Sequence, residues 1–240
     1  MLSEKQQSSE TLRKIEEKVD RLSSVLQELS NYSEESQDKK VATLSEKNVK
    51  EIVEAALRRY NADKVGIADF ALESSGAQIH DSFHSETYDV GAARVILFGL
   101  PLWLDVKSPR VILQPDNSPG NCWAFKGQSG YVVIKLSKII TPTAFTLEHI
   151  PKVLSPTIDR TIPSAPKLFQ VLGWKDDSGK EKILYGNYEF NSDDDFLQTF
   201  KVQNIKDLIP VQYIEFQVLS NHGNKEYTCV YRFRVHGNPQ

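Results

Sequence analysis

A short loop at residues 114–121 is the clearest candidate for a chemical role in this sequence. It contains two prolines, a glycine and several Asn, Asp and Ser residues, so it can continue neither a strand nor a helix. Such a tight loop turns backbone carbonyls outward, here beside Asp116. Carbonyls with one carboxylate are ligands that a hard cation prefers. Two interpretations follow: the loop binds a cation, or its role is structural.

The other reactive residue types do not form a catalytic pattern. The two cysteines, Cys122 and Cys229, lie outside any CxxC pair, and no phosphate-binding glycine loop or GxSxG motif occurs. The histidines show no metal-ligand spacing; they are His80, His84, His149, His222 and His236. The Asp193–Asp195 cluster falls in a turn, which is typical of a solvated surface. The sequence therefore predicts a protein that is not an enzyme.

Composition narrows the functional class further. The 240 residues carry a net charge of -3, which gives no basic field for nucleic acid. No apolar run approaches the roughly 20 residues that span a bilayer. We therefore expect any membrane attachment to depend on a segment outside this chain.

The elements that must position these residues change character near residue 61. Apolar residues recur at helical spacing over Leu12–Leu29 and again over Val49–Tyr60, with a polar break at Asn31–Lys40. Two arrangements are compatible with this pattern: a trimeric coiled-coil stalk, or helices that fold back into a small bundle. We assign residues 1–61 to this helical segment.

Residues 62–240 contain many short runs of alternating or β-branched and aromatic residues, with turns between them and no long helices. This pattern predicts a mainly β domain, an antiparallel β-sandwich. The expected strands are Tyr131–Leu136, Ala144–Glu148, Leu168–Leu172, Ile183–Phe190, Thr199–Val202, Tyr213–Leu219 and Thr228–Val235.

The most apolar stretch of this domain is Val95–Leu104, which Gly99 and Pro101 divide in two. From the sequence alone it is either two buried strands or a mobile apolar hairpin between polar flanks. If this hairpin extends from the domain, its apolar side chains would need to be covered by another surface.

Several ordered motifs resemble the SUN domain of inner-nuclear-membrane proteins, over about three quarters of the chain. They are Ala68–Ser74, Ser85–Tyr88, Ile112–Asp116 with Pro119–Phe125, Thr146–His149 and Glu226–Gly237. The resemblance implies a non-enzymatic nuclear-envelope tether. Its luminal domain would lie in the perinuclear space, bind the C-terminal tail of a KASH protein to form a LINC complex, and transmit cytoskeletal force to the nucleus.

The resemblance also implies specific site residues. The KASH carboxyl terminus would enter a pocket formed by His149, Ser164, Tyr227 and Tyr231, where a histidine and hydroxyls donate hydrogen bonds to the carboxylate. The hairpin near residues 88–108 would be a lid that pairs with the tail by β-augmentation, through Val95, Ile96, Leu97, Phe98, Leu102 and Trp103.

Three further properties follow from the resemblance. Cys122 and Cys229 would form a disulfide, as an oxidising lumen permits. The loop would hold a structural monovalent cation, potassium, at Val111, Gln114, Asp116 and Asn121 with Tyr231 nearby. Active SUN domains are homotrimers, and the amino-terminal helices could instead hold this chain as an autoinhibited monomer.

The sequence departs from the family at three places. His84 occupies the position of a cysteine that in many SUN domains bonds covalently to the KASH tail. His222–Lys225 replaces a Trp-Gly-His-Pro sequence, and the Thr157–Thr161 segment is slightly longer than usual. These departures affect the predicted partner preference.

A function of another class is also compatible with a β-sandwich. A lectin-like jelly-roll module could bind glycan through an exposed Trp123 or Trp174 together with a cation at Asp116.

Overall fold

The computed structural model describes residues 19–20, 23–24, 50, 53, 65–89, 94–97, 100–104, 107–205 and 208–240. The chain divides into two compact units, Met1–Gly66 and Ile67–Gln240. Most of the predicted amino-terminal helical segment lies outside the described residues; those of it that are described are helical. Among the described residues, no helix combines the length and apolar character needed to cross a bilayer.

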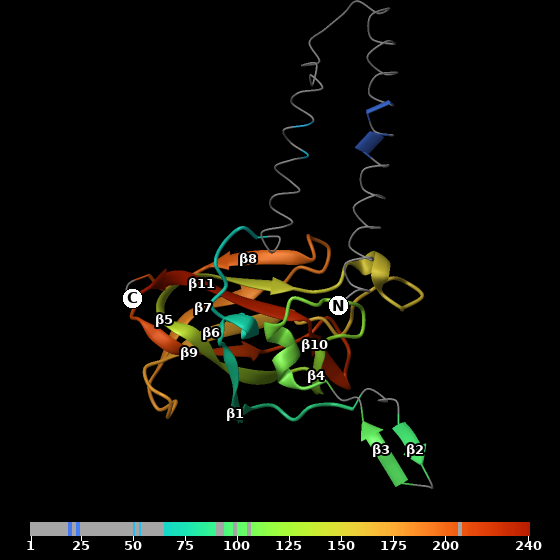
Figure 1. Cartoon of the computed structure of the whole chain (residues 1–240), viewed down its shortest axis with the longest axis horizontal. Coiled ribbons are helices and arrows are strands. Elements are labelled where there is room, and N and C mark those ends of the chain that lie inside the picture. The colour runs from blue at the N-terminus through green and yellow to red at the C-terminus, as the bar shows by residue number, and fades with distance from the viewer. Residues whose placement is uncertain are drawn as a thin grey trace, which may run out of the picture. The chain divides into compact units, whose positions relative to one another are not determined.

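The second unit is built from antiparallel strands, which confirms the predicted fold class (Figure 1). The main sheet contains β1 (Gln78–His84), β5 (Gly130–Glu148), β6 (Leu168–Trp174), β7 (Lys182–Glu189), β8 (Leu197–Lys201), β9 (Val211–Val218) and β11 (Arg232–Pro239). A small sheet pairs β4 (Trp123–Lys126) with β10 (Tyr227–Val230), and a hairpin pairs β2 (Arg94–Leu97) with β3 (Leu100–Leu104). Three short 3₁₀ helices are η1 (Glu73–Ser75), η2 (Pro109–Leu113) and η3 (Lys152–Leu154).

The long strand β5 joins the two layers of the sandwich. Its first half, Gly130–Lys135, lies between β1 and β9, whereas its second half, Ala144–Glu148, lies between β11 and β8. The expectation of two separate strands here was wrong. The β-branched Ile139 and Ile140 favour extended backbone, and a shift of register at Gly237 accommodates Pro142.

Aromatic side chains fill the space between the layers. Phe216 of β9 stacks on Phe233 of β11 with ring centroids 4.4 Å apart, and Phe145 of β5 lies 6.1 Å from Phe233. All three rings are buried. This aromatic core fixes β11 against β5, and with it the residues at the ends of both strands.

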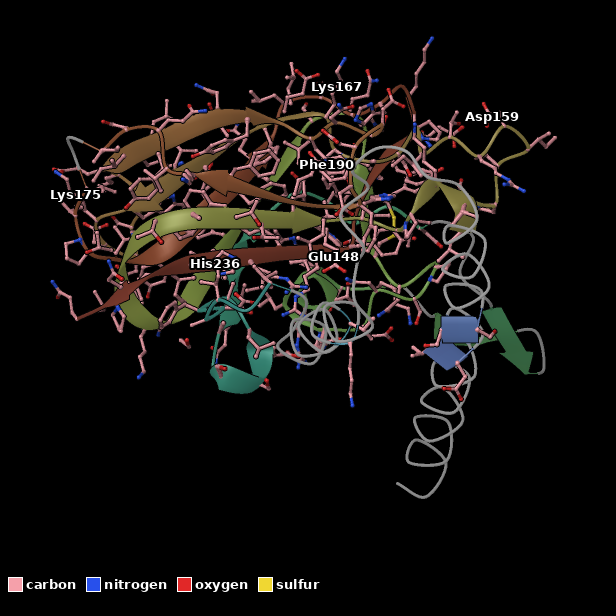
Figure 2. The ribbon with its side chains drawn as sticks, turned by 90° about the horizontal axis from the view of Figure 1, so that it is seen from above. Glu148, Asp159, Lys167, Lys175, Phe190 and His236 are labelled. Carbon is pink, nitrogen blue, oxygen red and sulfur yellow. A yellow bond between two sulfur atoms is a disulfide. The ribbon has the colours of Figure 1, made fainter. Side chains whose placement is uncertain are left out.

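The opposite side of β11 is also buried, but it is polar. Arg234 forms an ion pair with Glu148, and Arg232 pairs with Asp69 at 3.0 Å. His236 bonds to the Ala68 carbonyl at 2.7 Å through Nδ1. Figure 2 shows Glu148 and His236 on the layer formed by β5 and β11. The ion pair between Arg234 and Glu148 fixes the carboxyl end of β5, where His149 follows, and the other two bonds join β11 to residues 68–69.

The predicted strand Thr228–Val235 is divided in two. β10 pairs with β4, Tyr231 follows, and β11 then pairs with β5. The chain therefore passes from the small sheet to the main sheet at Tyr231, which places this side chain where the two sheets meet.

Candidate functional site

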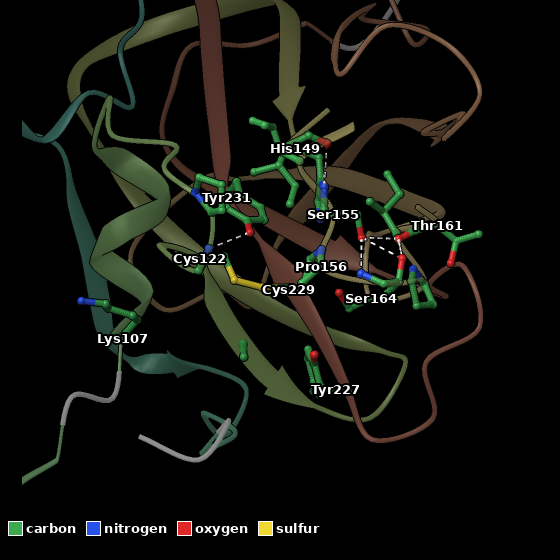
Figure 3. A pocket seen from close by; sticks show the side chains of 18 of the residues that line it. Lys107, Cys122, His149, Ser155, Pro156, Thr161, Ser164, Tyr227, Cys229 and Tyr231 are labelled. Atoms are coloured by element: carbon green, nitrogen blue, oxygen red, sulfur yellow. Dashed lines mark hydrogen bonds between the residues drawn. A yellow bond between two sulfur atoms is a disulfide. The ribbon is translucent and has the colours of Figure 1, made fainter. Parts of the chain in front are cut away.

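The described residues line a cavity of about 570 Å³ that is partly open to solvent, near the junction of the two sheets (Figure 3). All four residues of the predicted carboxylate pocket, His149, Ser164, Tyr227 and Tyr231, line it. The remaining lining residues are Tyr88, Lys107, Pro119, Gly120, Cys122, Ala124, Ile150, Leu154, Ser155, Pro156, Thr157, Thr161, Ile162, Pro163 and Cys229. The cavity thus brings together segments that are far apart in the sequence.

One side of the cavity, which we call the buried wall, consists of Cys122, His149, Cys229 and Tyr231. Cys122 and Cys229 form a disulfide across 107 positions of sequence, with Cα atoms 5.7 Å apart. Both residues are 7% exposed. The pairing implied by the family resemblance is therefore present, and it ties the end of the 114–121 loop to β10.

Tyr231 connects this loop to the pocket. Its hydroxyl accepts a hydrogen bond from the backbone N–H of Gly120 at 3.1 Å. Gly120 has φ +86°, a left-handed conformation that glycine adopts without strain. Burial raises the pKa of Tyr231, so the hydroxyl keeps its proton and can donate it to a ligand.

His149 is 3% exposed and packs its ring edge-on against Tyr231, with centroids 4.7 Å apart. Its Nδ1 lies 3.3 Å from the Ile150 carbonyl oxygen, which can only accept, so we assign the proton to Nδ1. Burial lowers the pKa of His149 to about 4, so the ring is neutral near pH 7. Nε2 therefore offers an acceptor, contrary to the expectation that His149 donates to an anion.

Ser164 is held beside the disulfide by backbone bonds. Its carbonyl accepts the Cys229 N–H at 2.8 Å, while the carbonyls of Pro163 and Ala165 accept N–H groups of Asn224 and His222. The His222–Lys225 segment, one of the departures noted above, thus supports the residues that flank Ser164.

Tyr227 is half-buried and stacks on Tyr88, with centroids 5.1 Å apart. The Tyr88 hydroxyl donates to Glu226 at 3.1 Å, and this hydrogen bond is the main reason that the pKa of Tyr88 is raised. In the sequence, Tyr88 precedes the β2–β3 hairpin and Lys107 follows it, so residues on both sides of the hairpin line the cavity.

The opposite side, which we call the loop wall, is the segment Leu154–Thr161. The hydroxyls of Ser155 and Thr157 both donate to the Thr161 carbonyl, at 2.6 and 2.8 Å. Thr161 in turn donates to the Asp159 carboxylate through its N–H and its hydroxyl, and these bonds lower the pKa of Asp159. Figure 3 shows Ser155 and Thr161 across the cavity from Tyr231 and the disulfide.

The 114–121 loop is closed by its own hydrogen bonds, and its carboxylate is already engaged. Asp116 accepts the Ser118 N–H at 3.0 Å and the Ser118 hydroxyl at 2.6 Å, which together lower its pKa. The Asp116 carbonyl accepts Asn121 Nδ2 at 2.9 Å, and the Val111 carbonyl accepts the Gln114 N–H at 3.1 Å. No group of three His, Cys, Asp or Glu side chains within the described residues could hold a metal ion.

The oxygen atoms that this loop offers therefore fit a monovalent cation better than a divalent one. Carbonyl oxygens have a second lone pair, so Val111 and Asp116 keep capacity for an ion. Both polar atoms of the Asn117 side chain are buried and lack a partner among the described residues. This side chain therefore keeps its capacity to form hydrogen bonds.

A hairpin is present at the predicted position as β2–β3, and its role as a lid stays a prediction. Its backbone pairs Val95 with Trp103 and Ile96 with Pro101, whereas Phe98 lies outside the described residues. The structure does not describe the side chains of Val95, Ile96, Leu97, Leu102 and Trp103, so their proposed contacts with a peptide stay a prediction.

The expectation of an exposed tryptophan was wrong. Trp123 is 0% exposed and donates to Thr87 Oγ1, and Trp174 is 1% exposed and donates to Glu215 Oε2. Neither indole can stack on a sugar without a change in the fold. The two indole rings are large and apolar, so burial is favourable once the single N–H of each has a hydrogen-bond partner.

Comparison with known proteins identifies the family. The model of the Sad1 / UNC-like C-terminal family matches residues 102–239. SUN domain-containing protein 2 of Mus musculus is 49% identical over 199 residues, 83% of this chain and 27% of that protein. SUN domain-containing protein 1 of Homo sapiens is 50% identical over 196 residues, 82% of this chain and 25% of that protein. The chain belongs to the Sad1/UNC-like, or SUN domain, family.

The chain spans about a quarter of the length of these two relatives. A solved carbohydrate-binding module of family 32, from Streptococcus pneumoniae EndoD, aligns with a TM-score of 0.49 and 16% identity. That alignment covers 71% of this chain and 99% of the module. A similarity at this level carries no functional inference.

Proposed function

We propose that this chain binds the C-terminal tail of a KASH protein and forms the luminal part of a LINC complex at the nuclear envelope. The observation that carries the proposal is the shared cavity of His149, Ser164, Tyr227 and Tyr231, which come from separate segments. Three of these residues have hydroxyls that can donate to a terminal carboxylate, and charge-assisted bonds of this kind are strong.

The tail would enter beside the β2–β3 hairpin. Tyr88, before the hairpin in the sequence, and Lys107, after it, both line the cavity, so a peptide seated there could add a strand to the hairpin edge. The hairpin is a sheet of two strands, which is marginally stable alone and would gain from a third.

We propose that the complex is non-covalent. His84 stands where many SUN domains have a reactive cysteine, and the two cysteines of the chain are bonded to each other. The His84 ring bonds to the Ser85 carbonyl at 2.9 Å through Nδ1. Reducing agent should therefore leave peptide retention unchanged while the Cys122–Cys229 bond is protected.

We further propose that the 114–121 loop binds potassium, through the carbonyls of Val111, Gln114, Asp116 and Asn121 with Tyr231 nearby. Bound there, the ion would stiffen the loop that reaches the pocket through the Gly120–Tyr231 bond. Asp116→Ala should loosen this loop and weaken peptide binding without unfolding the sandwich; unchanged affinity would count against the ion.

The active form would be a homotrimer in the perinuclear space. The amino-terminal helices would either extend as a stalk or hold the chain as an inhibited monomer. Deletion of residues 1–48 should raise trimer content and peptide affinity in the inhibited arrangement, because only an open fraction binds before the deletion. Loss of the trimer on deletion would identify the helices as a stalk. Light scattering with and without peptide reports both properties.

The proposed function is tested by pull-down with a KASH tail peptide, alongside a glycan array. Retention of the peptide with no glycan signal supports the tether. A glycan signal without peptide retention would support the lectin-like alternative, although the burial of Trp123 and Trp174 removes the aromatic surfaces that it required.

A further inference from the structure

One edge of the main sheet is closed by side chains instead of by another strand. β7 lies at the end of the strand order β1–β5–β9–β6–β7, so among the described strands it has a neighbour on one side only. A strand edge of this kind presents N–H and C=O groups that can pair with a strand of another chain. In this protein the residues Gln203 and Asn204, which we call the edge segment, follow β8 and lie along β7.

The Gln203 side chain takes the place that a peptide group of an added strand would have. Its Oε1 accepts the Asn187 N–H at 3.0 Å, and its Nε2 donates to the Asn187 carbonyl at 2.7 Å. A residue in a hydrogen-bonded pair of an antiparallel sheet exchanges the same two bonds with the residue opposite. The primary amide can do this because it carries both a donor and an acceptor.

The rest of the edge segment closes the adjoining part of β7. The backbone N–H groups of Gln203 and Asn204 both donate to the Tyr185 carbonyl, at 2.9 and 3.1 Å. The Asn204 side chain donates to the Leu184 carbonyl at 3.3 Å. The edge segment therefore occupies outward-facing groups of β7 from residue 184 to residue 187.

Gly186 leaves the space that this arrangement needs. A Cβ atom at this position would lie 2.8 Å from Gln203 Oε1 and 2.6 Å from the hydroxyl of Tyr188. Both separations are too short, so a side chain at position 186 would displace Gln203 or Tyr188. A glycine inside a strand often marks such a close approach, and here the approaching group is the amide that closes the edge.

The β7 edge has the properties of a surface that would pair with a second copy of itself. Antiparallel pairing about a two-fold axis matches each outward group with the same strand of the other copy. Lys182 and Glu189 are exposed at opposite ends of β7, so such pairing brings the lysine end of one strand to the glutamate end of the other. It would also cover Leu184, which is 39% exposed.

We propose that Gln203 and Asn204 keep the β7 edge closed, and that opening this edge lets two copies of the chain associate by antiparallel β7–β7 pairing. The edge segment thus prevents self-association through the main sheet. The inference does not depend on the proposed tail binding, because no residue of β7 lines the cavity described above.

The test replaces Gln203 by methionine, which is of similar length but cannot form the two bonds to Asn187. In native-state hydrogen exchange of the full chain, the Asn187 amide should exchange about tenfold faster, the effect of one lost hydrogen bond. Sedimentation velocity over a series of protein concentrations should show an additional species, larger than that of the unaltered chain, whose share grows with concentration.

Gln198→Met is the matched control. Gln198 accepts the Asn191 N–H at 3.0 Å and donates to the Asn191 carbonyl at 2.7 Å, but Asn191 lies between β7 and β8 and not on the strand edge. The control therefore loses equivalent bonds and gains the same apolar side chain, yet it should sediment like the unaltered chain. The same larger species in both variants would overturn the inference, because association would then not require the β7 edge.

A second substitution tests the pairing itself. Asn187→Pro, added to Gln203→Met, removes the outward N–H of the edge, so the larger species should disappear; its persistence would contradict β7–β7 pairing. Where Gln203→Met does not fold, Gln203→Ala removes the same two bonds and should give the same changes. An unchanged exchange rate of the Asn187 amide, or faster exchange without a larger species, would also overturn the inference.

Discussion

The two walls of the cavity are held in different ways. In the buried wall, the Cys122–Cys229 bond and the Gly120–Tyr231 hydrogen bond join residues more than a hundred positions apart. The four side chains that form this wall are buried: Cys122, His149, Cys229 and Tyr231. In the loop wall, the hydrogen bonds of Ser155 and Thr157 reach no further than Thr161, and Leu154 is 51% exposed.

This difference assigns separate tasks to the two walls. The buried wall can position hydrogen-bonding groups accurately because moving them would disturb the sandwich. The loop wall is a locally closed turn at one end of the domain; Figure 2 shows its Asp159 at the end opposite Lys175. Changes in the loop wall should therefore alter what binds without altering the stability of the fold.

The largest expected effect comes from the disulfide. Replacing both Cys122 and Cys229 by serine should lower the free energy of unfolding by about 4–5 kcal/mol, because the bond closes a loop of roughly a hundred residues in the unfolded chain. Urea denaturation measures the change. A loss below about 1 kcal/mol would mean that the buried wall does not depend on this bond.

The second-largest expected effect is that the free energy of unfolding depends on pH through the protonation of His149. In the unfolded chain this residue binds a proton near its usual pKa of about 6.5, whereas in the folded chain burial lowers the pKa to about 4. Unfolding therefore takes up a proton between these values, and the free energy of unfolding falls as pH drops through this window. Above about pH 6.5 this residue adds no pH dependence.

His149→Phe isolates this contribution. Between pH 7.5 and pH 4.5 the unaltered chain should lose about 2–3 kcal/mol more than the variant. The comparison cancels the carboxylates that titrate in both proteins. Identical pH dependence in the two would show that His149 is not buried as a neutral ring.

A smaller effect is expected for the bond between the loop and the pocket. Tyr231→Phe keeps the ring and removes the acceptor of the Gly120 N–H, so the free energy of unfolding should fall by about 1 kcal/mol. Faster amide exchange of Gly120 in the variant would confirm the local cause. Unchanged exchange would mean that the hydroxyl does not hold the loop.

The smallest effect is expected in the loop wall. Ile158 is fully exposed, so Ile158→Ser should leave the denaturation midpoint unchanged. Thr157→Val, which removes one of the two hydroxyls on the Thr161 carbonyl, should do the same. A clear destabilisation by either substitution would show that the loop wall, like the buried wall, contributes to the stability of the fold.

The sequence predicted the buried wall better than the loop wall. Long motifs include Cys122, His149, Cys229 and Tyr231, so a family resemblance could identify them. Leu154, Ser155 and Pro156 lie between the motifs and carry no special chemistry, and only the folded chain shows that they line the cavity. Tyr88 is the last residue of the Ser85–Tyr88 motif, so the sequence could have indicated that it lies at the cavity.

Other features required three-dimensional information. Alternation predicts strands, but it could not show that β5 is one strand shared by two layers, or that the chain changes sheets at Tyr231. Nor could residue types show which nitrogen of His149 carries the proton, because the Ile150 carbonyl determines it.

The central claim is that the cavity recognises a terminal carboxylate, and one titration tests it directly. A KASH tail peptide and the same peptide extended by one residue are titrated into the full chain by calorimetry. Extension removes the carboxylate from the hydroxyls of Ser164, Tyr227 and Tyr231, so the extended peptide should bind at least tenfold more weakly. Equal affinity of the two peptides would contradict the assignment of this cavity.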